Sequence, residues 1–150
     1  MTADLKWGTI AGVFFVHWSG IPTRAAMRVL APEIEKLSKQ SSPVIFLSLA
    51  TAFQRPTGEE HDAWDEFVES TLRAHCLHAH SVIDAPGITG AIVRSAVTSV
   101  LILKGYTSKV TIHASILDAF RDIERRHGIA MADLMRGARL HDLLPLAKSA

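Results

Sequence analysis

The apolar run from Ile88 to Leu103 limits what this chain can fold into more than any other segment. It follows the strand-like segment Ser81-Val82-Ile83 and the turn Asp84-Ala85-Pro86-Gly87. As a helix, its apolar side chains cover more than half of the circumference: Ile92, Val93, Ala96, Val97, Val100 and Leu103. Arg94, Ser95, Thr98 and Ser99 form the remaining stripe. We expect the sheet to cover one side of this helix, and a neighbouring helix or a second subunit to cover the other.

Length and composition are typical of a single globular domain over residues 1–150, with a core at about 5–127 and a C-terminal helix at 130–145. The chain has 150 residues, of which 48% are hydrophobic and 21% charged. Its formal charge of +1 gives no electrostatic reason to bind nucleic acid. No run is long enough for a membrane span. Met1 to Asp4 lack a signal-like pattern, and Cys76 is the only cysteine, so we expect a cytoplasmic protein.

Strand patterns and helix patterns alternate along the chain. The expected strands are Lys6–Trp18 (a hairpin broken at Ala11-Gly12), Val44–Leu49, Ser81–Ile83 and Lys109–Ala114. The expected helices are one capped by Thr23 with a kink or a restart at Pro32, one after the capping box Thr57–Glu60, then Ile88–Leu103, Ile116–Arg126 and Met131–Leu144. This order predicts an α/β fold with a mainly parallel five-stranded sheet, an antiparallel first strand, and helices packed on the sheet.

The order of elements over about residues 5 to 127 resembles the SpoIIAA-like proteins and STAS domains, which share the anti-anti-sigma-factor fold. In STAS regulators a hydroxyl after the third strand is phosphorylated by a partner kinase. The matching stretch here is Ser48 to Glu60, in which Thr57-Gly58 resembles the hydroxyl–glycine pair and no Asp precedes it. The resemblance implies regulation through a protein partner. The candidate regulatory or binding residues are Thr57, Ser48, Thr51, Asp84 and Arg94.

The segment His75-Cys76-Leu77-His78-Ala79-His80 concentrates metal-ligand side chains. In an extended conformation Cys76, His78 and His80 would lie on one side, and they are ligand types for zinc or copper. The alternative is a solvated helix-to-strand connection. Because one local run supplies only part of a coordination shell, we expect no tightly held metal there and no cofactor.

Other candidate groups have a structural and a functional interpretation. His17, His113 and Asp84 could form an acid–base site, but no phosphate-binding loop or nucleophile motif accompanies them, which favours a protein that is not an enzyme. The acidic run from Glu59 to Glu69 is a solvated helix face, or a surface that pairs with Arg125, Arg126, Arg136 and Arg139 of another subunit. The aromatic residues Trp7, Phe15 and Trp18 form the sheet core or line a pocket.

These patterns favour a non-catalytic regulatory or scaffold protein that binds protein partners, as a homodimer, in bacterial signalling if the STAS resemblance holds. The alternative is a protein that binds a small molecule, lipid or metal. That binder would use the crevice at the carboxyl ends of the strands, or the His75–His80 run. A broad apolar patch would favour the first hypothesis, and an enclosed pocket with converging polar groups the second.

Overall fold

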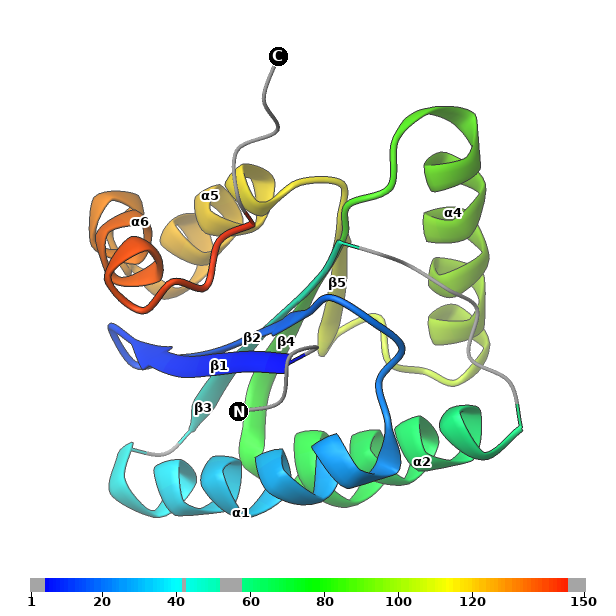
Figure 1. Cartoon of the computed structure of the whole chain (residues 1–150), viewed down its shortest axis with the longest axis horizontal. Coiled ribbons are helices and arrows are strands. Elements are labelled where there is room, and N and C mark those ends of the chain that lie inside the picture. The colour runs from blue at the N-terminus through cyan, green and yellow to red at the C-terminus, as the bar shows by residue number, and fades with distance from the viewer. Residues whose placement is uncertain (1–4, 42, 52–57, 146–150) are drawn as a thin grey trace.

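The computed structural model describes residues 5–41, 43–51 and 58–145 of the chain. Within these ranges, five strands form one sheet in the order β1-β2-β3-β4-β5 (Figure 1). They are β1 (Leu5–Ile10), β2 (Val13–Trp18), β3 (Val44–Ala50), β4 (Cys76–Ile83) and β5 (Val110–His113). β1 is antiparallel to β2, and the other neighbouring pairs are parallel. The predicted α/β fold with a mainly parallel sheet and an antiparallel first strand is confirmed.

The hairpin between β1 and β2 turns at Ala11-Gly12, where the sequence predicted the break. Ile10 pairs with Val13, so the connection has two residues. Both have positive φ, +50° at Ala11 and +84° at Gly12. Positive φ at both positions is the requirement of a type I′ turn, whose twist matches that of two antiparallel strands. The turn thus fixes β1 as the antiparallel edge of the sheet.

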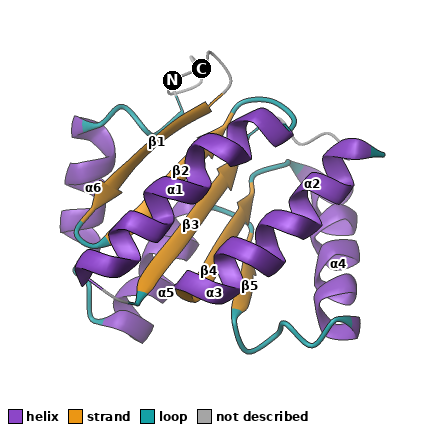
Figure 2. Ribbon diagram, turned by 90° about the horizontal axis from the view of Figure 1, so that it is seen from below, coloured by secondary structure: helices purple, strands orange, loops and turns teal. Residues whose placement is uncertain are grey.

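Helices cover both faces of the sheet (Figures 1 and 2). On one face, α1 (Arg24–Ser41) and α2 (Glu59–Phe67) pack over Phe14, Val16 and Phe46. On the other, α5 (Ile116–His127) and α6 (Met131–Leu140) pack over Val13, Phe15 and Leu47. Because side chains alternate along a strand, each of β1 to β4 supplies both cores. α2 continues through a π-helical turn, η1 (Val68–Leu72), into the short α3 (Arg73–His75).

The apolar helix α4 (Gly87–Leu103) lies on neither face. It stands beside the sheet, past the β5 edge (Figure 1). Gly90 is its only residue in the buried class, and Ile88, Ile92 and Leu103 are 81%, 63% and 86% exposed. The expectation that the sheet would cover one side of this helix is therefore wrong. Among the residues described, no helix is long and apolar enough to cross a bilayer.

Several predicted element boundaries differ from the structure. β4 begins at Cys76 rather than Ser81, so the histidine run lies inside a strand. α1 continues through Pro32 without the predicted restart. α6 ends at Leu140 rather than Leu144, and Asp142 just beyond it has a φ of +52°, which breaks helical geometry.

The start of α2 differs from the predicted capping box. The helix begins at Glu59 with Gly58 as its N-cap, and among the described residues no side chain caps it. Thr57, the predicted cap and regulatory hydroxyl, lies outside the described residues.

Candidate functional site

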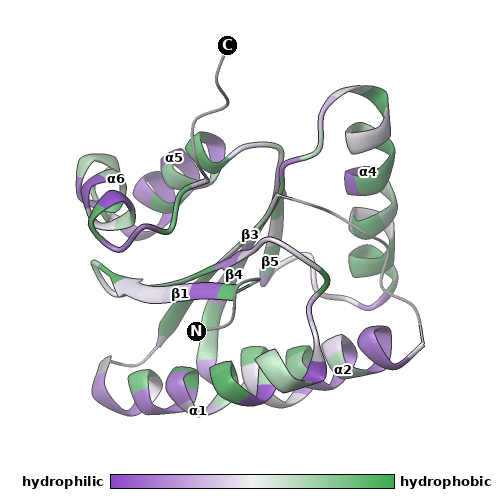
Figure 3. Cartoon of the chain, viewed as in Figure 1, coloured by the Kyte–Doolittle hydropathy of each residue, from purple (hydrophilic) through white to green (hydrophobic). Residues whose placement is uncertain are grey.

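The first candidate site is the exposed apolar side of α4, here called the α4 face: Ile88, Ile92, Ala96, Val100 and Leu103. These residues follow one another at spacings of four, four, four and three, so they form a continuous stripe. Figure 3 shows how strongly apolar α4 is. Large apolar stripes on a protein surface mark sites of interaction with other molecules.

Polar contacts attach α4 to the rest of the chain. The Arg94 guanidinium donates from Nη1 to the carbonyl oxygens of Ile83 and Ala85, at 3.0 and 3.1 Å. Near the other end of the helix, Lys104 Nζ lies 3.1 Å from Asp65 Oδ1 on α2. The candidate residue Arg94 is thus an internal anchor. The candidate Asp84 is exposed, and its backbone amide donates to the Ala50 carbonyl.

The second candidate site is a buried group of imidazoles between the sheet and α5, here called the histidine cluster. His78 and His80 come from β4, His113 from the end of β5, and His127 from the last residue of α5. Asp122, also on α5, lies next to them with its side chain 12% exposed. Of the four histidines, His80 is the most enclosed, with no exposed surface. The idea of a solvated connection around these histidines is therefore wrong.

Hydrogen bonds connect three imidazoles in a row. His80 Nδ1 lies 3.0 Å from His113 Nε2, and His80 Nε2 lies 3.1 Å from His127 Nε2. A neutral imidazole has one N–H donor and one acceptor nitrogen, so either of two opposite proton arrangements satisfies both bonds. His78 is turned to a different partner, with Nε2 at 2.7 Å from Thr111 Oγ1.

Burial keeps the histidine cluster uncharged. It lowers the pKa of His80 to about 3, and repulsion from His78, His113 and His127 acts in the same direction. Burial also lowers the pKa of His78, His113 and His127, with Arg126 contributing at each. At neutral pH each imidazole therefore keeps a nitrogen lone pair that can accept a hydrogen bond or coordinate a metal ion.

Asp122 is the anionic member of this group. Burial on its own would raise the pKa of the carboxyl, but hydrogen bonds from Arg125 and Arg126 outweigh it, and the net pKa is lowered. Arg126 Nε lies 2.8 Å from Asp122 Oδ2, and Arg125 holds Oδ1. Arg125 and Arg126 thus pair within their own chain. Asp122 is held as a carboxylate in a fixed orientation.

Cys76 does not join His78 and His80, contrary to the sequence expectation. The register between β3 and β4 shifts, because Val44 pairs with Cys76 while its neighbour Ile45 pairs with His78. Leu77 is the extra residue of this irregularity, which reverses the alternation of side chains. Cys76 accordingly belongs to the core under α1, opposite the histidines.

The structure does not bring together the acid–base group that the sequence analysis considered and disfavoured. His17 on β2 and His113 on β5 have β3 and β4 between them, a separation of about 14 Å at ordinary strand spacing. His17 Nε2 instead lies 3.0 Å from Thr51 Oγ1. The candidate Ser48 is buried and accepts a hydrogen bond from the Trp18 indole at 3.0 Å. Ser48 and Thr51 therefore have structural partners on β2.

The aromatic group is divided between the two cores. Trp7 stacks on Phe14 and Trp18 packs on Trp64 on one face, while Phe15 packs on Phe120 on the other. These residues fill the core rather than line one pocket.

Acidic residues of the run from Glu59 to Glu69 form ion pairs within their own chain. Arg24 on α1 contacts Glu59 and Glu66, and Arg73 pairs with Glu69. Lys104 pairs with Asp65 in the same way. These ion pairs partly neutralise the acidic run within the chain itself.

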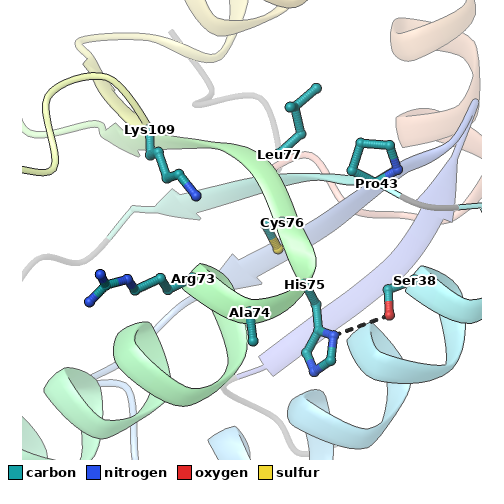
Figure 4. Close-up of a pocket in the computed structure, with 8 residues that line it drawn as sticks. All are labelled: Ser38, Pro43, Arg73, Ala74, His75, Cys76, Leu77 and Lys109. Atoms are coloured by element: carbon teal, nitrogen blue, oxygen red, sulfur yellow. Dashed lines mark hydrogen bonds between the residues drawn. The ribbon is translucent and has the colours of Figure 1, made fainter.

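A hollow of about 310 Å³ lies at the amino ends of β4 and its neighbours, with Cys76 at its wall (Figure 4). Ser38 Oγ and His75 Nδ1 form a hydrogen bond of 3.3 Å at its edge, and Lys109 lines the opposite side. The expected crevice was at the carboxyl ends of the strands, the other end of the sheet. Burial raises the pKa of the Cys76 thiol to about 12, so it is not a nucleophile at neutral pH.

Comparison with known proteins adds no assignment. No family model, no curated protein and no solved structure matches this chain.

Proposed function

We propose that this chain is a non-catalytic regulatory or scaffold protein that acts through protein–protein binding, with the α4 face as its contact surface. The observation that carries the proposal is the exposure of that face on a helix whose only charged residue, Arg94, is turned toward the end of β4. Removing such a surface from water is the main favourable term in most protein–protein association.

A second copy of the chain is the partner that suits this surface best. Around a two-fold axis the same patch meets itself, so a charge near the axis would face its own copy. The α4 face has none. Ile92, Ala96 and Val100 alternate large, small and large, so an antiparallel copy could place Ala96 on the axis with Ile92 against Val100. A small residue there lets two helices approach closely.

A membrane surface suits this helix less well. Helices that lie on anionic bilayers carry Lys and Arg along their polar side. The polar stripe of α4 consists of Ser95, Thr98, Ser99 and the inward-turned Arg94. Ser99 and Thr98 donate their hydroxyls to carbonyls within the helix itself. The element order that resembles STAS regulators supports a protein partner as well.

Light scattering coupled to gel filtration tests the proposal over a micromolar concentration range. We expect a mass of twice 16.4 kDa for the native chain, and a monomer for Ile92→Glu. Val29→Glu is the matched control, because Val29 is also an exposed apolar helix residue, 53% exposed, but lies on α1. It should leave the dimer intact.

A mass of 16.4 kDa throughout that range, or equal effects of the two substitutions, would contradict the proposed dimer. Flotation with phosphatidylcholine vesicles separates the lipid alternative. Binding to the vesicles that is lost in Ile92→Glu would assign the α4 face to a bilayer instead.

A further inference from the structure

We propose that His80, His113 and Asp122 form a binding site for a divalent transition-metal ion, with Zn²⁺ as the ion of best fit. The site is separate from the α4 face, and the proposal does not depend on that function. It departs from the expectation of no cofactor, because two of its three ligands come from outside the His75–His80 run.

The distances between the three donor atoms carry the proposal. His80 Nδ1 lies 3.0 Å from His113 Nε2 and 3.6 Å from Asp122 Oδ2, and His113 Nε2 lies 3.8 Å from the same oxygen. A tetrahedral zinc ion with bonds of about 2.0–2.1 Å holds its ligand atoms about 3.3–3.4 Å apart. The three observed distances between ligand atoms, 3.0, 3.6 and 3.8 Å, lie on either side of that value.

Hydrogen bonding to the imidazoles does not account for how close Asp122 lies to them. Its Oδ2 is too far from both imidazole nitrogens, at 3.6 and 3.8 Å, to accept a proper hydrogen bond from either. It nevertheless lies close to both. An ion bonded to all three atoms would join them, whereas the histidines by themselves leave the carboxylate without a direct contact to the rings.

The surroundings prepare each ligand for a metal. Both imidazole ligands are buried between the sheet and α5, at 0% exposure for His80 and 8% for His113. Arg126 and Arg125 orient the carboxylate from outside, and each oxygen has a second lone pair available. The side chains of Arg126 and Arg125 are 40% and 70% exposed, so water screens their positive charge.

His127 is a positioning residue for this site. Its Nε2 lies 3.1 Å from His80 Nε2, the nitrogen that points away from the proposed ion. If His80 Nε2–H donates to His127, the lone pair of His80 is left on Nδ1, where the ion would bind. Histidine ligands of metals usually donate their other N–H to such an acceptor. His78 is not placed as a ligand, because its Nε2 contacts Thr111.

The test is a titration of tag-free, chelator-treated protein with Zn²⁺, and with Co²⁺ as a spectroscopic substitute, at pH 7.5. We expect one equivalent per chain, a rise in melting temperature, and visible Co²⁺ absorption bands typical of four-coordination. His113→Gln and Asp122→Asn should weaken binding at least tenfold and abolish those bands. His61→Gln is the control, because His61 is an exposed histidine beside Asp62 and Asp65 on α2.

Two further measurements keep the test decisive. His127→Leu should lower the affinity about 10–100-fold and change the Co²⁺ spectrum, while His127→Gln, which keeps an acceptor, restores both. Should the ligand variants fail to fold, zinc-induced NMR shifts of the His80 and His113 ring protons in the native chain locate the ion. Less than one equivalent at 100-fold excess metal, or binding unchanged in His113→Gln, would overturn the proposal.

Discussion

Helices α4 and α5 both follow parallel strands, yet they relate to the sheet in opposite ways. α5 buries Ala119, Phe120 and Ile123 against it and carries charged residues on its outer side. α4 is far more apolar and has only Gly90 in the buried class. The comparison shows that the amount of apolar surface on a helix does not decide whether its own sheet covers it. What matters is whether the apolar residues lie on one side of the helix, because a sheet can cover only one side.

The two helices also differ at their starts. The Ser115 hydroxyl accepts a hydrogen bond from the Asp118 amide at the start of α5, and Gly128 ends that helix with a φ of +70°. α4 begins after Pro86 with no side-chain cap. α4 also ends at a glycine of positive φ, Gly105 at +73°. The two helices therefore differ at their starts, where a side chain caps α5, whereas the Arg94 guanidinium of α4 bonds to the carbonyls of Ile83 and Ala85.

The largest expected difference between the two helices is in core packing. Phe120→Ala on α5 removes a fully buried ring that packs edge-on against Phe15, and we expect a loss of about 3–5 kcal/mol in the free energy of unfolding. Ile92→Ala on α4, measured where the chain is monomeric, should change it by less than about 0.5 kcal/mol. Urea unfolding followed by circular dichroism measures both. Similar losses would mean that α4 packs against the chain more closely than its exposure indicates.

The next largest effect on stability is expected where α4 begins, at Gly90. A methyl group at Gly90 would lie 1.9 Å from the Ala85 carbonyl oxygen, a backbone atom that cannot rotate away. We expect Gly90→Ala to cost about 1–3 kcal/mol through this overlap, although alanine favours helices. Ala91→Ser, at the exposed neighbouring position, should be nearly neutral. Equal stabilities of the two variants would show that α4 can shift its first turn freely.

A smaller effect follows from the buried His17, which lies on the β2 strand under the α5 and α6 side. Burial, with a contribution from Lys6, lowers its pKa in the folded state. The unfolded chain therefore binds the proton more readily, and stability falls as the pH drops below about 6.5. His17→Gln should reduce the slope of unfolding free energy against pH by up to about 1.4 kcal/mol per unit. A slope that stays the same between pH 5 and 7 would contradict this assignment.

The smallest effect concerns the cap of α5. Ser115→Ala removes the acceptor for the Asp118 amide, so we expect a loss of about 1 kcal/mol. Thr89→Ala in the first turns of α4 has no such bond to lose and serves as the counterpart. Thermal melts of the two variants should differ by a few degrees; coincident melts would show that water replaces the Ser115 hydroxyl without cost.

Local chemistry explains which parts of the fold could be predicted from the sequence. The Ala11-Gly12 turn, the Ser115 cap and the continuous apolar strand at Val44 depend on residues close together in the chain, and the structure confirms them. The extent of α4 was also predicted to within one residue at its start. What covers α4 could not be predicted, because apolar composition does not identify a partner surface.

The histidine cluster could be predicted only in part for a related reason. His80 stood out in a local run, but its partners His113 and His127 are 33 and 47 residues away. Pairing β4 with β5 brings His113 to it, and packing α5 on the sheet brings His127. The useful sequence signal was a polar histidine in the next strand, together with an Asp and a His on the helix after it.

The irregularity at Leu77 has a consequence for how chain length can vary in relatives of this protein. Leu77 is 52% exposed and is skipped in the pairing of β4 with β3. A chain without this residue would keep Cys76 on the α1 side and His78 and His80 on the α5 side, since regular alternation would then give the same arrangement. We therefore expect deletion of Leu77 to leave the side chains of β4 on the same faces of the sheet. Deletion of Ala79 would instead move one of the two neighbouring histidines to the α1 side. In an alignment of relatives, we expect gaps at position 77 and none across residues 78–83.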